Sequence, residues 1–502
     1  MFKQLFKVNI DSLFAAIFGF VLILLFSKHN GIGISPDSIA YSATARNLIA
    51  GNGFIDYTDM PLVVFPLFYP FFLAVIGFVF NTDIIQLAPF LNAFLYASVI
   101  FLSGIVIENF KYKTKLYKRV LLILITLSPS LIEVYTMLWS ETLFILLSLI
   151  FFYFFRKYFQ NHNLKSLSIA AIISALAFDT RYAGITLIAT GVLLIFFDKN
   201  IRWQLKALHV VYFGSIGVSL AAINLIRNVW VVGLATGMRQ KGITPLMKNF
   251  EYSGNVLTDW FSLDIHNQLI LKIIFFLILI LFVAFFVRNV RHWKAFYTYE
   301  NIAVSFFVVY VLFIVISSTI SRYETINNRL LAPAFLPFLF ISTCQIPKWR
   351  KSLSQRHLSW IFLGFTLGIG VLFAISYLSV NEENLEYMQE TGIPGYSEDT
   401  WEKSRIVNYL QKHPEIFDND SIIYSNHSQA VYFLTGNQTI SLPERVYRID
   451  VHEFESHPSA LLIWFNMDDN PDLLNIKEIR RMKQMKRLKT FPDGAIFKLT
   501  NR

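Results

Sequence analysis

Apolar stretches long enough to cross a bilayer recur along most of this chain, and they constrain its fold more than any other feature. Hydrophobic residues make up 55% of the 502 residues and charged residues 16%, whereas soluble domains carry about 25% charged residues. Reading stretches of about 17 to 25 apolar residues as spanning helices predicts an α-helical polytopic membrane protein with about eleven spans. The expected spans lie near residues 10–27, 84–107, 120–138, 142–157, 166–180, 183–197, 207–227, 269–287, 301–320, 329–346 and 358–379.

One apolar segment, Phe65–Phe80, is too short to cross the bilayer as a helix. Its roughly 16 residues would reach about 24 Å, against a hydrocarbon core of about 30 Å, and Pro66 and Pro70 stand near its start. We therefore expect it to lie flat on the membrane or to re-enter. The short basic connections then all fall on one side of the membrane, and the positive-inside bias assigns this side to the cytoplasm. The N-terminus is expected inside and the C-terminus outside, in the plasma (inner) membrane of a bacterium.

The formal net charge of +10 does not indicate nucleic-acid binding. Lys and Arg gather in short connections between apolar runs, not on a patch with interleaved aromatic residues. The basic excess therefore records membrane topology. The single cysteine, Cys344, excludes a disulfide within the chain and a zinc site built from several cysteines.

The composition changes near Asn381, where charged and polar residues replace the long apolar runs. We predict a transmembrane domain over residues 1–380, with its first outer loop at 28–83, and a soluble extracytoplasmic α/β domain over 381–502. Within the soluble domain, Trp401–Lys412 has the spacing of an amphipathic helix. Three short apolar runs predict strands, at Ser421–Ser425, Ala460–Phe465 and Ala495–Leu499.

An aspartate stands just after the first expected span. In the run Ser35–Tyr41, Ser35 can cap a helix whose first residue is Pro36. Asp37 then lies in the positive first turn, where the helix dipole stabilises its anionic form, and Tyr41 follows one turn later on the same face. We interpret Asp37 as a residue that orients a hydroxyl group or a cation. The alternative is that Asp37 only favours the helix start.

Two further motifs fall at the same expected outer face. Glu141 follows Ser140 at the mouth between two expected spans, where the pair can also simply cap and charge a helix start. Arg181 and Tyr182 interrupt two other apolar runs. Arg181 offers a bidentate fork for a phosphate, and Tyr182 offers an amphipathic ring at the interface. The alternative for Arg181 is an interfacial anchor or an ion pair with Asp179.

Two arginines mark the place where a later span leaves the outer face. Arg329 precedes Pro333 and Pro337, and Arg322 lies nearby, so two cations could flank one anionic group. Snorkelling of an arginine at a helix end is the alternative. Two acids and several arginines at one face are what transfer from a lipid-linked phosphate donor requires. The acid aligns an acceptor hydroxyl, and the cations stabilise the departing phosphate.

The order of these motifs resembles that of the GT-C superfamily of integral-membrane glycosyltransferases. The similarity is greatest to family-39-like enzymes related to protein O-mannosyltransferases and aminoarabinose lipid A transferases, and it covers roughly residues 10–345. The motifs that carry it are Asp37–Tyr41, Phe65–Pro70, Ser140–Phe144, Thr180–Gly184, and Arg329 with Pro333 and Pro337. The resemblance implies a polyprenyl-phosphate sugar donor, inversion at the anomeric carbon, and juxtamembrane helices in the first outer loop.

Carried onto this sequence, the resemblance implies that Asp37 is the catalytic acid of the first outer loop and that Glu141 is the second acid of the site. The candidates for binding the substrate are Tyr41, Arg181, Tyr182, Arg322 and Arg329. The sequence shows no metal-ligand cluster, although Asp37 and Glu141 could share a divalent cation if the fold brings them together.

The expected function is transfer of a hexosyl or pentosyl group from a polyprenyl phosphate to a glycan, lipid or protein acceptor at the outer face. A transporter or flippase of lipid-linked saccharides is the alternative class, but it would need ionisable residues at mid-depth, and the spans contain few. A noncatalytic membrane anchor would not need so many spans. The connection 227–268, with Arg239, Lys241 and Lys248, could cover the site or bind an acidic partner.

Overall fold

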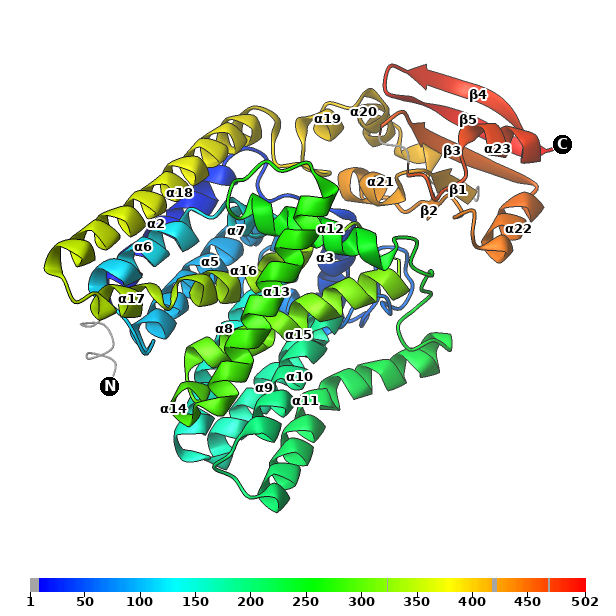
Figure 1. Ribbon diagram of the computed structural model, residues 1–502. Coiled ribbons are helices and arrows are strands. Elements are labelled where there is room, and N and C mark those ends of the chain that lie inside the picture. Colours follow the sequence, from blue (N-terminus) through cyan, green and yellow to red (C-terminus); the bar gives the residue numbers. More distant parts are fainter. Residues whose placement is uncertain (1–8, 323, 418–421, 468–469) are drawn as a thin grey trace. The chain divides into compact units, whose positions relative to one another are not determined.

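The computed structural model describes residues 9–322, 324–417, 422–467 and 470–502, which divide into two compact units. The first unit comprises Met1–Phe26, Val63–Phe72 and Leu87–Glu386. The second comprises Ser27–Leu62, Leu73–Gln86 and Tyr387–Arg502. Figure 1 labels their helices and strands.

The first unit is built from helices. They are α2 (Ile10–Phe26), α5 (Ile84–Glu108), α6 (Lys115–Thr126), α7 (Pro129–Tyr135), α8 (Glu141–Asn161), α9 (Leu164–Thr180), the 3-10 turn η1 (Tyr182–Gly184), α10 (Ile185–Phe197), α11 (Trp203–Val232), α12 (Leu246–Asp259), α13 (Gln268–Arg291), α14 (Trp293–Phe296), α15 (Tyr299–Ile320), α16 (Asn328–Thr343), α17 (Ile346–Ser352) and α18 (Arg356–Thr391). Helices thus stand at every position where a span was expected.

Seven of the described helices are long and apolar enough to cross a bilayer, with α16 and α17 counted as one continuous segment. They are α5, α8, α11, α13, α15, α16 with α17, and α18. Shorter apolar helices accompany them, namely α2, α4 (Phe68–Phe80) and η1 with α10. The predicted class, a helical polytopic membrane protein, is confirmed. The 13 residues of α4 reach only about 20 Å, too short for a span.

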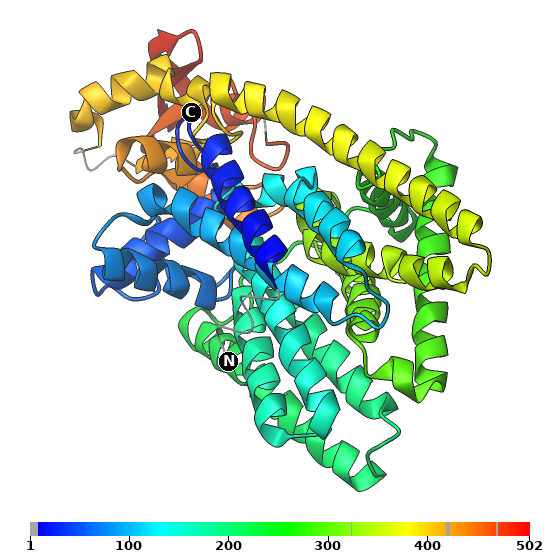
Figure 2. The ribbon, with the colours of Figure 1, turned by 90° about the vertical axis from the view of Figure 1, so that its left-hand side faces the viewer.

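Small residues bring α9 close to its neighbours. The turn between α8 and α9 contains His162 with a φ of 47° and Asn163, whose side chain caps α9 by accepting the Lys165 N–H at 2.8 Å. The buried face of α9 includes Ala170, Ala171, Ser174, Ala175 and Ala177. Small side chains let membrane helices approach closely, and Figures 1 and 2 show α9 beside α8 and α11.

The span expected at 120–138 is interrupted. Leu127 and Ser128 separate α6 from α7, and Pro129 is the first residue of α7, with Ser128 as its cap. Proline lacks an N–H and is tolerated at the first helical position, but it cannot continue the preceding helix. The expectation of one continuous helix was therefore wrong. The Leu127 carbonyl at the break accepts a hydrogen bond from the Asn381 side chain at 2.8 Å, which satisfies a group that lipid could not.

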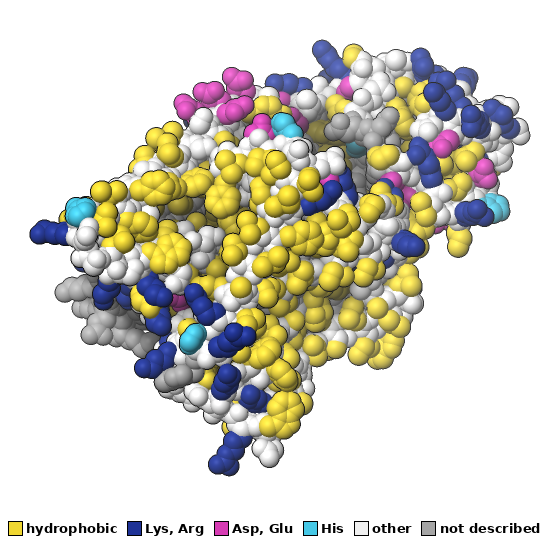
Figure 3. All heavy atoms as spheres, in the orientation of Figure 1, with side chains coloured by type: hydrophobic (Ala, Val, Ile, Leu, Met, Phe, Trp, Pro, Cys, Tyr) yellow, Lys and Arg dark blue, Asp and Glu magenta, His cyan; other side chains and the backbone are white. Residues whose placement is uncertain are grey.

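Large apolar side chains remain exposed on the surface of α13 and α18. Ile280 is 63% exposed and Leu372 is 68% exposed. Figure 3 shows hydrophobic side chains spread over the face that carries α13. Soluble monomers rarely expose contiguous apolar patches of this extent, so this surface fits contact with lipid.

The second unit contains a five-stranded sheet in the order β2-β1-β3-β5-β4. Its strands are β1 (Ile422–Ser425), β2 (Ile440–Ser441), β3 (Ser459–Phe465), β4 (Lys483–Phe491) and β5 (Gly494–Asn501), and its helices are α3 (Pro36–Ile49), α19 (Asp399–Glu402), α20 (Arg405–Lys412), α21 (Ser428–Thr435), α22 (Arg448–Ser456) and α23 (Ile476–Met482). β1 pairs in parallel with β2 and β3, and β5 is antiparallel to β3 and β4. The expected α/β character is confirmed, with strands at all three expected places; Ser421 lies outside the described residues.

The amphipathic helix expected at Trp401–Lys412 is also interrupted. Its first residues belong to α19, and Ser404 starts a new helix, α20, by accepting the Val407 N–H at 3.2 Å. The Ser404 hydroxyl also donates to Asp493 at 2.5 Å. A serine in this position favours a helix start over a helix interior because its side chain competes for backbone groups.

Residues of the first outer loop pack with the C-terminal part of the chain inside the second unit. The rings of Tyr57 and Tyr432 lie 5.6 Å apart, and the Tyr396 N–H donates to the Ile34 carbonyl at 2.8 Å. The two compact units therefore alternate along the sequence. The domain boundary expected near residue 380 stays a prediction.

Candidate functional site

Three helix ends meet at a buried carboxylate. Glu141 is the first residue of α8, Arg181 directly follows α9, and Arg329 lies in the first turn of α16. The Arg329 Nε donates to Glu141 Oε1 at 2.7 Å, and the Arg181 guanidinium forms an ion pair with Glu141 Oε2. Glu141 is 0% exposed. We call these three residues the Arg–Glu–Arg cluster, and it joins three residues that the sequence placed at one face.

Ser140 stands at the N-cap position of α8, but its side chain makes no capping hydrogen bond to the helix. The alternative that Ser140 only caps the helix start is therefore not supported. Instead the Ser140 hydroxyl accepts a hydrogen bond from Arg181 at 3.2 Å and approaches Glu141 Oε2 at 3.5 Å. Ser140 therefore helps to hold the arginine against the glutamate.

Two residues that the sequence did not single out complete the surroundings of Arg329. Its guanidinium lies over the Trp139 ring, 4.1 Å from the centroid, and donates to Glu324 at 3.3 Å. A guanidinium between an aromatic face and carboxylates is fixed in plane as well as in position. Trp139 could have been found from the sequence because it lies two residues before Glu141, next to a helix start.

The turn after α9 depends on a glycine. The Gly184 N–H donates to the Arg181 carbonyl at 2.7 Å and closes the turn that presents Arg181. A Cβ on Gly184 would clash with the Ala177 carbonyl and the Phe178 nitrogen. The close approach of two backbone segments here therefore requires glycine.

Tyr182 lies beside the connection 227–268. The Arg239 guanidinium stands over the Tyr182 ring at 5.7 Å and donates to the Val64 carbonyl at 2.7 Å. The Tyr182 hydroxyl is buried and makes no hydrogen bond to any described residue. Arg181, its neighbour, pairs with Glu141.

Arg322 is held by the same connection. Its N–H donates to the Gln240 carbonyl at 3.0 Å, and its guanidinium donates to the Gln240 side chain at 2.9 Å. Lys241 and Ser321 form a β-bridge beside it. The connection thus contacts two predicted site residues, Tyr182 and Arg322. That Arg322 and Arg329 flank one anionic group stays a prediction.

Asp37 and Tyr41 belong to the second unit, on α3. The Ser35 and Ser38 side chains and backbone bond reciprocally in a capping box, and Pro36 is the first residue of the helix. The expected helix start is confirmed, with Asp37 half-buried in its first turn and Tyr41 only 3% exposed. That these two residues act with the Arg–Glu–Arg cluster stays a prediction.

The Arg–Glu–Arg cluster is not arranged as a metal site. Both Glu141 oxygens are engaged by guanidinium groups, and a metal ion would have to displace them. Among the residues that the structure describes, no group of three or more His, Cys, Asp and Glu side chains could hold a metal ion. A divalent cation shared by Asp37 and Glu141 is therefore disfavoured on the Glu141 side.

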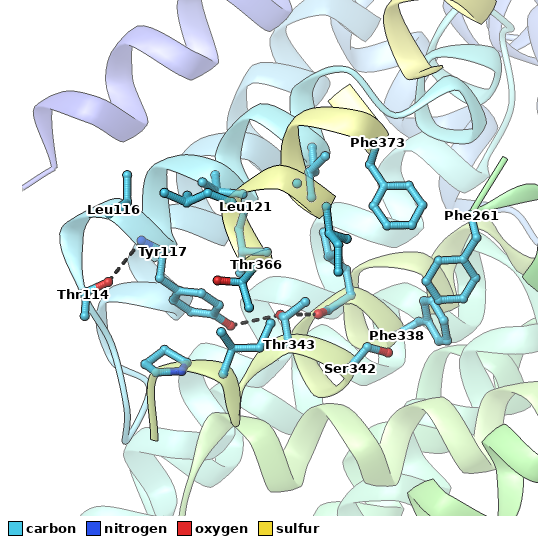
Figure 4. A pocket seen from close by; sticks show the side chains of 18 of the residues that line it. Thr114, Leu116, Tyr117, Leu121, Phe261, Phe338, Ser342, Thr343, Thr366 and Phe373 are labelled. Atoms are coloured by element: carbon cyan, nitrogen blue, oxygen red, sulfur yellow. Dashed lines mark hydrogen bonds between the residues drawn. The ribbon is translucent and has the colours of Figure 1, made fainter. Parts of the chain in front are cut away.

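A separate apolar cavity of about 150 Å³ lies among α6, α16 and α18 and contains none of the predicted site residues. Figure 4 shows aromatic and aliphatic side chains around it, with the Tyr117 hydroxyl directed at Thr343, 3.0 Å away. Apart from Arg350, the lining consists of apolar and uncharged side chains, which suit hydrocarbon. The cavity is therefore separate from the predicted site residues.

The fold can now be compared with known proteins. No family model matches the sequence, and no curated protein sequence matches it. Among solved structures, ArnT from Cupriavidus metallidurans in the apo state matches with a TM-score of 0.57 and 12% identity, over 96% of this chain and 97% of that chain. The same protein bound to undecaprenyl phosphate matches with a TM-score of 0.56 and 12% identity, over 98% of each chain.

An archaeal protein shares the fold as well. The oligosaccharyltransferase AglB from Archaeoglobus fulgidus, in complex with an inhibitory peptide and a dolichol-phosphate, matches with a TM-score of 0.53 and 9% identity, over 91% of this chain and 70% of that chain. ArnT and AglB are glycosyltransferases of the GT-C fold. At such low identity the likeness defines the fold, and at that level the resemblance drawn from the motifs is confirmed.

Proposed function

We propose that the protein is a membrane glycosyltransferase that moves one sugar from a polyprenyl-phosphate donor to a glycan, lipid or protein acceptor at the outer face of the membrane. The observation that carries the proposal is the Arg–Glu–Arg cluster, set at the ends of three helices within the GT-C fold. ArnT, which shares this fold, is seen bound to undecaprenyl phosphate, and that ligand has the lipid and phosphate parts of the donor proposed here.

The charge of the cluster supports a role in binding phosphate. Two guanidinium groups face the buried Glu141 carboxylate, and the second carboxylate on Arg329, that of Glu324, is 42% exposed, so the buried part of the site holds more cationic than anionic groups. Arg181 is 15% exposed and Arg329 is 12% exposed at the side chain, so both stay largely fixed while part of each can meet a ligand. A preorganised cation stabilises charge that develops on a leaving group without reorganising during the reaction.

Glu141 is best assigned as a positioning residue. Both of its oxygens already accept from guanidinium groups, so it is poorly placed to take a proton from an acceptor. Its two contacts hold the guanidinium groups of Arg181 and Arg329 at a fixed separation. Glu141 was expected to be a second catalytic acid. We propose instead that it orients Arg181 and Arg329.

Asp37 is proposed to orient the acceptor hydroxyl. Its place in the first turn of α3 favours the anionic form, which accepts a hydrogen bond well but is only a modest base. In the proposed step the acceptor oxygen attacks the anomeric carbon and the bond from that carbon to the phosphate oxygen breaks. Polyprenyl phosphate leaves with the electron pair, the acceptor proton passes to Asp37 or to water, and the configuration inverts.

Tyr41, Tyr182 and Arg322 are proposed to line the substrate path. The connection 227–268 is proposed to cover the site, because it contacts Tyr182 through Arg239 and Arg322 through Gln240. The C-terminal residues 381–502 are proposed to bind the acceptor or to cover the site on the extracytoplasmic side. We further propose a bacterial plasma membrane, with the N-terminus in the cytoplasm.

Transfer by the purified full-length protein in nanodiscs tests the proposal. A panel of polyprenyl-phosphate sugars carrying labelled hexoses or pentoses is supplied with envelope glycan, lipid and protein fractions, and labelled product is measured. Asp37→Asn should lose transfer, whereas the matched control Asp59→Asn should not, because Asp59 is exposed at a positive φ of 59° that asparagine also adopts. If the protein moves intact donor across the bilayer but transfers sugar from none of the donors, the proposal is wrong and the protein is a flippase.

A further inference from the structure

A polar cavity lies at the end of the helical unit opposite the Arg–Glu–Arg cluster. It has a volume of about 250 Å³ and is lined by the ends of α13, α15 and α17 and by the connection between α5 and α6. Glu300 lines it from the first turn of α15, whereas Arg322 follows the last turn of the same helix. Because α15 has 22 residues, about 33 Å separates its ends. The cavity is therefore about one bilayer thickness from the Arg322 end of α15.

Basic side chains from separate elements converge on this cavity. Lys111, Arg288, His292 and Lys348 line it. The ammonium groups of Lys111 and Lys348 lie 5.5 Å and 5.7 Å from the centroid of the same ring, Tyr112. Within the part of the chain that the structure describes, none of these four basic side chains forms an ion pair with a carboxylate. Figure 3 shows Lys and Arg side chains gathered with a histidine at the lower left of the molecule, near α14.

The floor of the cavity holds a carboxylate that lacks one partner. Glu300 is 4% exposed, and its Oε1 accepts the Lys111 N–H at 2.9 Å. Its Oε2 is buried without a hydrogen bond to any described residue. Leaving a buried acceptor unsatisfied is costly. The cavity thus offers cations for an anion and one deep acceptor for a hydrogen-bond donor.

The surroundings indicate that the ligand comes from the membrane. Trp349, next to Lys348 on α17, is 52% exposed, and Trp360 is 58% exposed. Exposed tryptophans mark the level of lipid headgroups. Val287, next to Arg288, is also exposed, so the cavity opens beside an apolar surface. Its volume of about 250 Å³ far exceeds the roughly 10–15 Å³ that one water molecule requires.

We propose that this cavity binds the headgroup of an anionic phospholipid that carries a hydroxyl donor, as phosphatidylglycerol does. The phosphate lies among Lys111, Arg288 and Lys348, and the headgroup hydroxyl donates to Glu300 Oε2. Basic pockets between membrane helices on the positively charged face bind anionic headgroups in this way. The lipid belongs to the leaflet opposite the transfer site, so the site is independent of the sugar donor and joins the ends of α13, α15 and α17.

Native mass spectrometry of the full-length protein tests this assignment. The protein in detergent is titrated with phosphatidylglycerol, phosphatidylmethanol, which lacks the hydroxyl donor, or phosphatidylcholine, which has no net charge. Wild type should retain one phosphatidylglycerol in preference to both others. Each removed cation should weaken retention about fivefold, so Arg288→Gln with Lys348→Gln should weaken it roughly 30-fold. Glu300→Gln should abolish the preference for phosphatidylglycerol over phosphatidylmethanol.

The matched control moves the same charges out of the cavity. Arg291→Gln with Lys351→Gln alters the same two segments, three residues further on, at exposed side chains that do not line the cavity. Retention in this control should equal that of wild type. Three results would each overturn the proposal. They are equal loss of lipid retention in both double variants, no preference for phosphatidylglycerol in wild type, and displacement of the lipid by glycerol 3-phosphate at matching concentration.

Discussion

Replacing Glu141 with glutamine should destabilise the protein far more than the same replacement at Glu324, although both carboxylates contact Arg329. Glu141 is 0% exposed and bridges two guanidinium groups. Removing one partner from a buried ion pair costs roughly 3–5 kcal/mol, because the remaining charge stays buried without compensation. Here two like charges remain, and the new amide NH₂ faces a guanidinium donor.

Glu324 provides the comparison within the same cluster. Its side chain is 42% exposed and lies 3.3 Å from Arg329, and an exposed ion pair contributes only about 0–1 kcal/mol. Glu324→Gln should therefore shift the free energy of unfolding by less than about 1 kcal/mol. The difference between the two variants should exceed roughly 2 kcal/mol.

Unfolding by sodium dodecyl sulfate in mixed micelles, followed by circular dichroism, measures both variants. Glu141→Asp serves as a third variant, since its shorter side chain keeps the charge but reaches one arginine better than two; an intermediate loss is expected. Transfer activity in nanodiscs should fall about 10²- to 10³-fold for Glu141→Gln, as for the loss of a preorganised transition-state donor. Equal free energies of unfolding for the Glu141 and Glu324 variants would refute the reasoning.

Three further predictions concern the site turn, the Arg329 stack and the second unit. Gly184→Ala should lower stability by roughly 1–3 kcal/mol through overpacking, whereas Gly214→Ala, with no neighbouring atom within 4 Å, should not; equal melting temperatures would contradict this. Arg329→Lys keeps the charge but loses the fork and the aromatic stack, so kcat/KM should fall roughly 30-fold, about 2 kcal/mol; unchanged kinetics would show that only charge matters. Burial raises the pKa of Asp83, but the hydrogen bond and charge of Arg46 outweigh it and hold that pKa below its usual value. The pair therefore stabilises the second unit above the usual aspartate pKa, and this contribution should disappear as the pH falls through the lowered value, an effect that Asp83→Asn should remove from acid-unfolding curves.

Much of the fold follows from the lengths of the apolar segments. A run of about 20 apolar residues leaves the backbone no option but a helix in lipid, so the positions of α5, α13 and α15 could be predicted. The interruption at Ser128–Pro129 was missed because the apolar pattern continues across it. β4 was missed for a different reason: Lys486, Arg487 and Lys489 give it no apolar alternation, as suits an exposed edge strand.

The site could be predicted as a set of residues but not as a set of contacts. Charges at the ends of apolar runs indicate which residues share a membrane face, and Glu141, Arg181 and Arg329 were found in this way. Their pairing depends on the packing of α8, α9 and α16, and Glu141 and Arg329 are 188 residues apart in the sequence. Helix capping was the alternative explanation for Ser140, and the local pattern could not show that its hydroxyl contacts Arg181.

The wide spacing of the Arg–Glu–Arg cluster along the chain constrains the order of membrane insertion. Ser140 and Arg181 are only 41 residues apart, so the α8–α9 hairpin can enter the bilayer with Glu141 and Arg181 already neutralising each other. Arg329 emerges from the ribosome much later, shortly after Glu324, with which it also pairs. During synthesis the growing chain thus passes through an electrically balanced intermediate, and the second arginine of the cluster reaches Glu141 only when α16 docks.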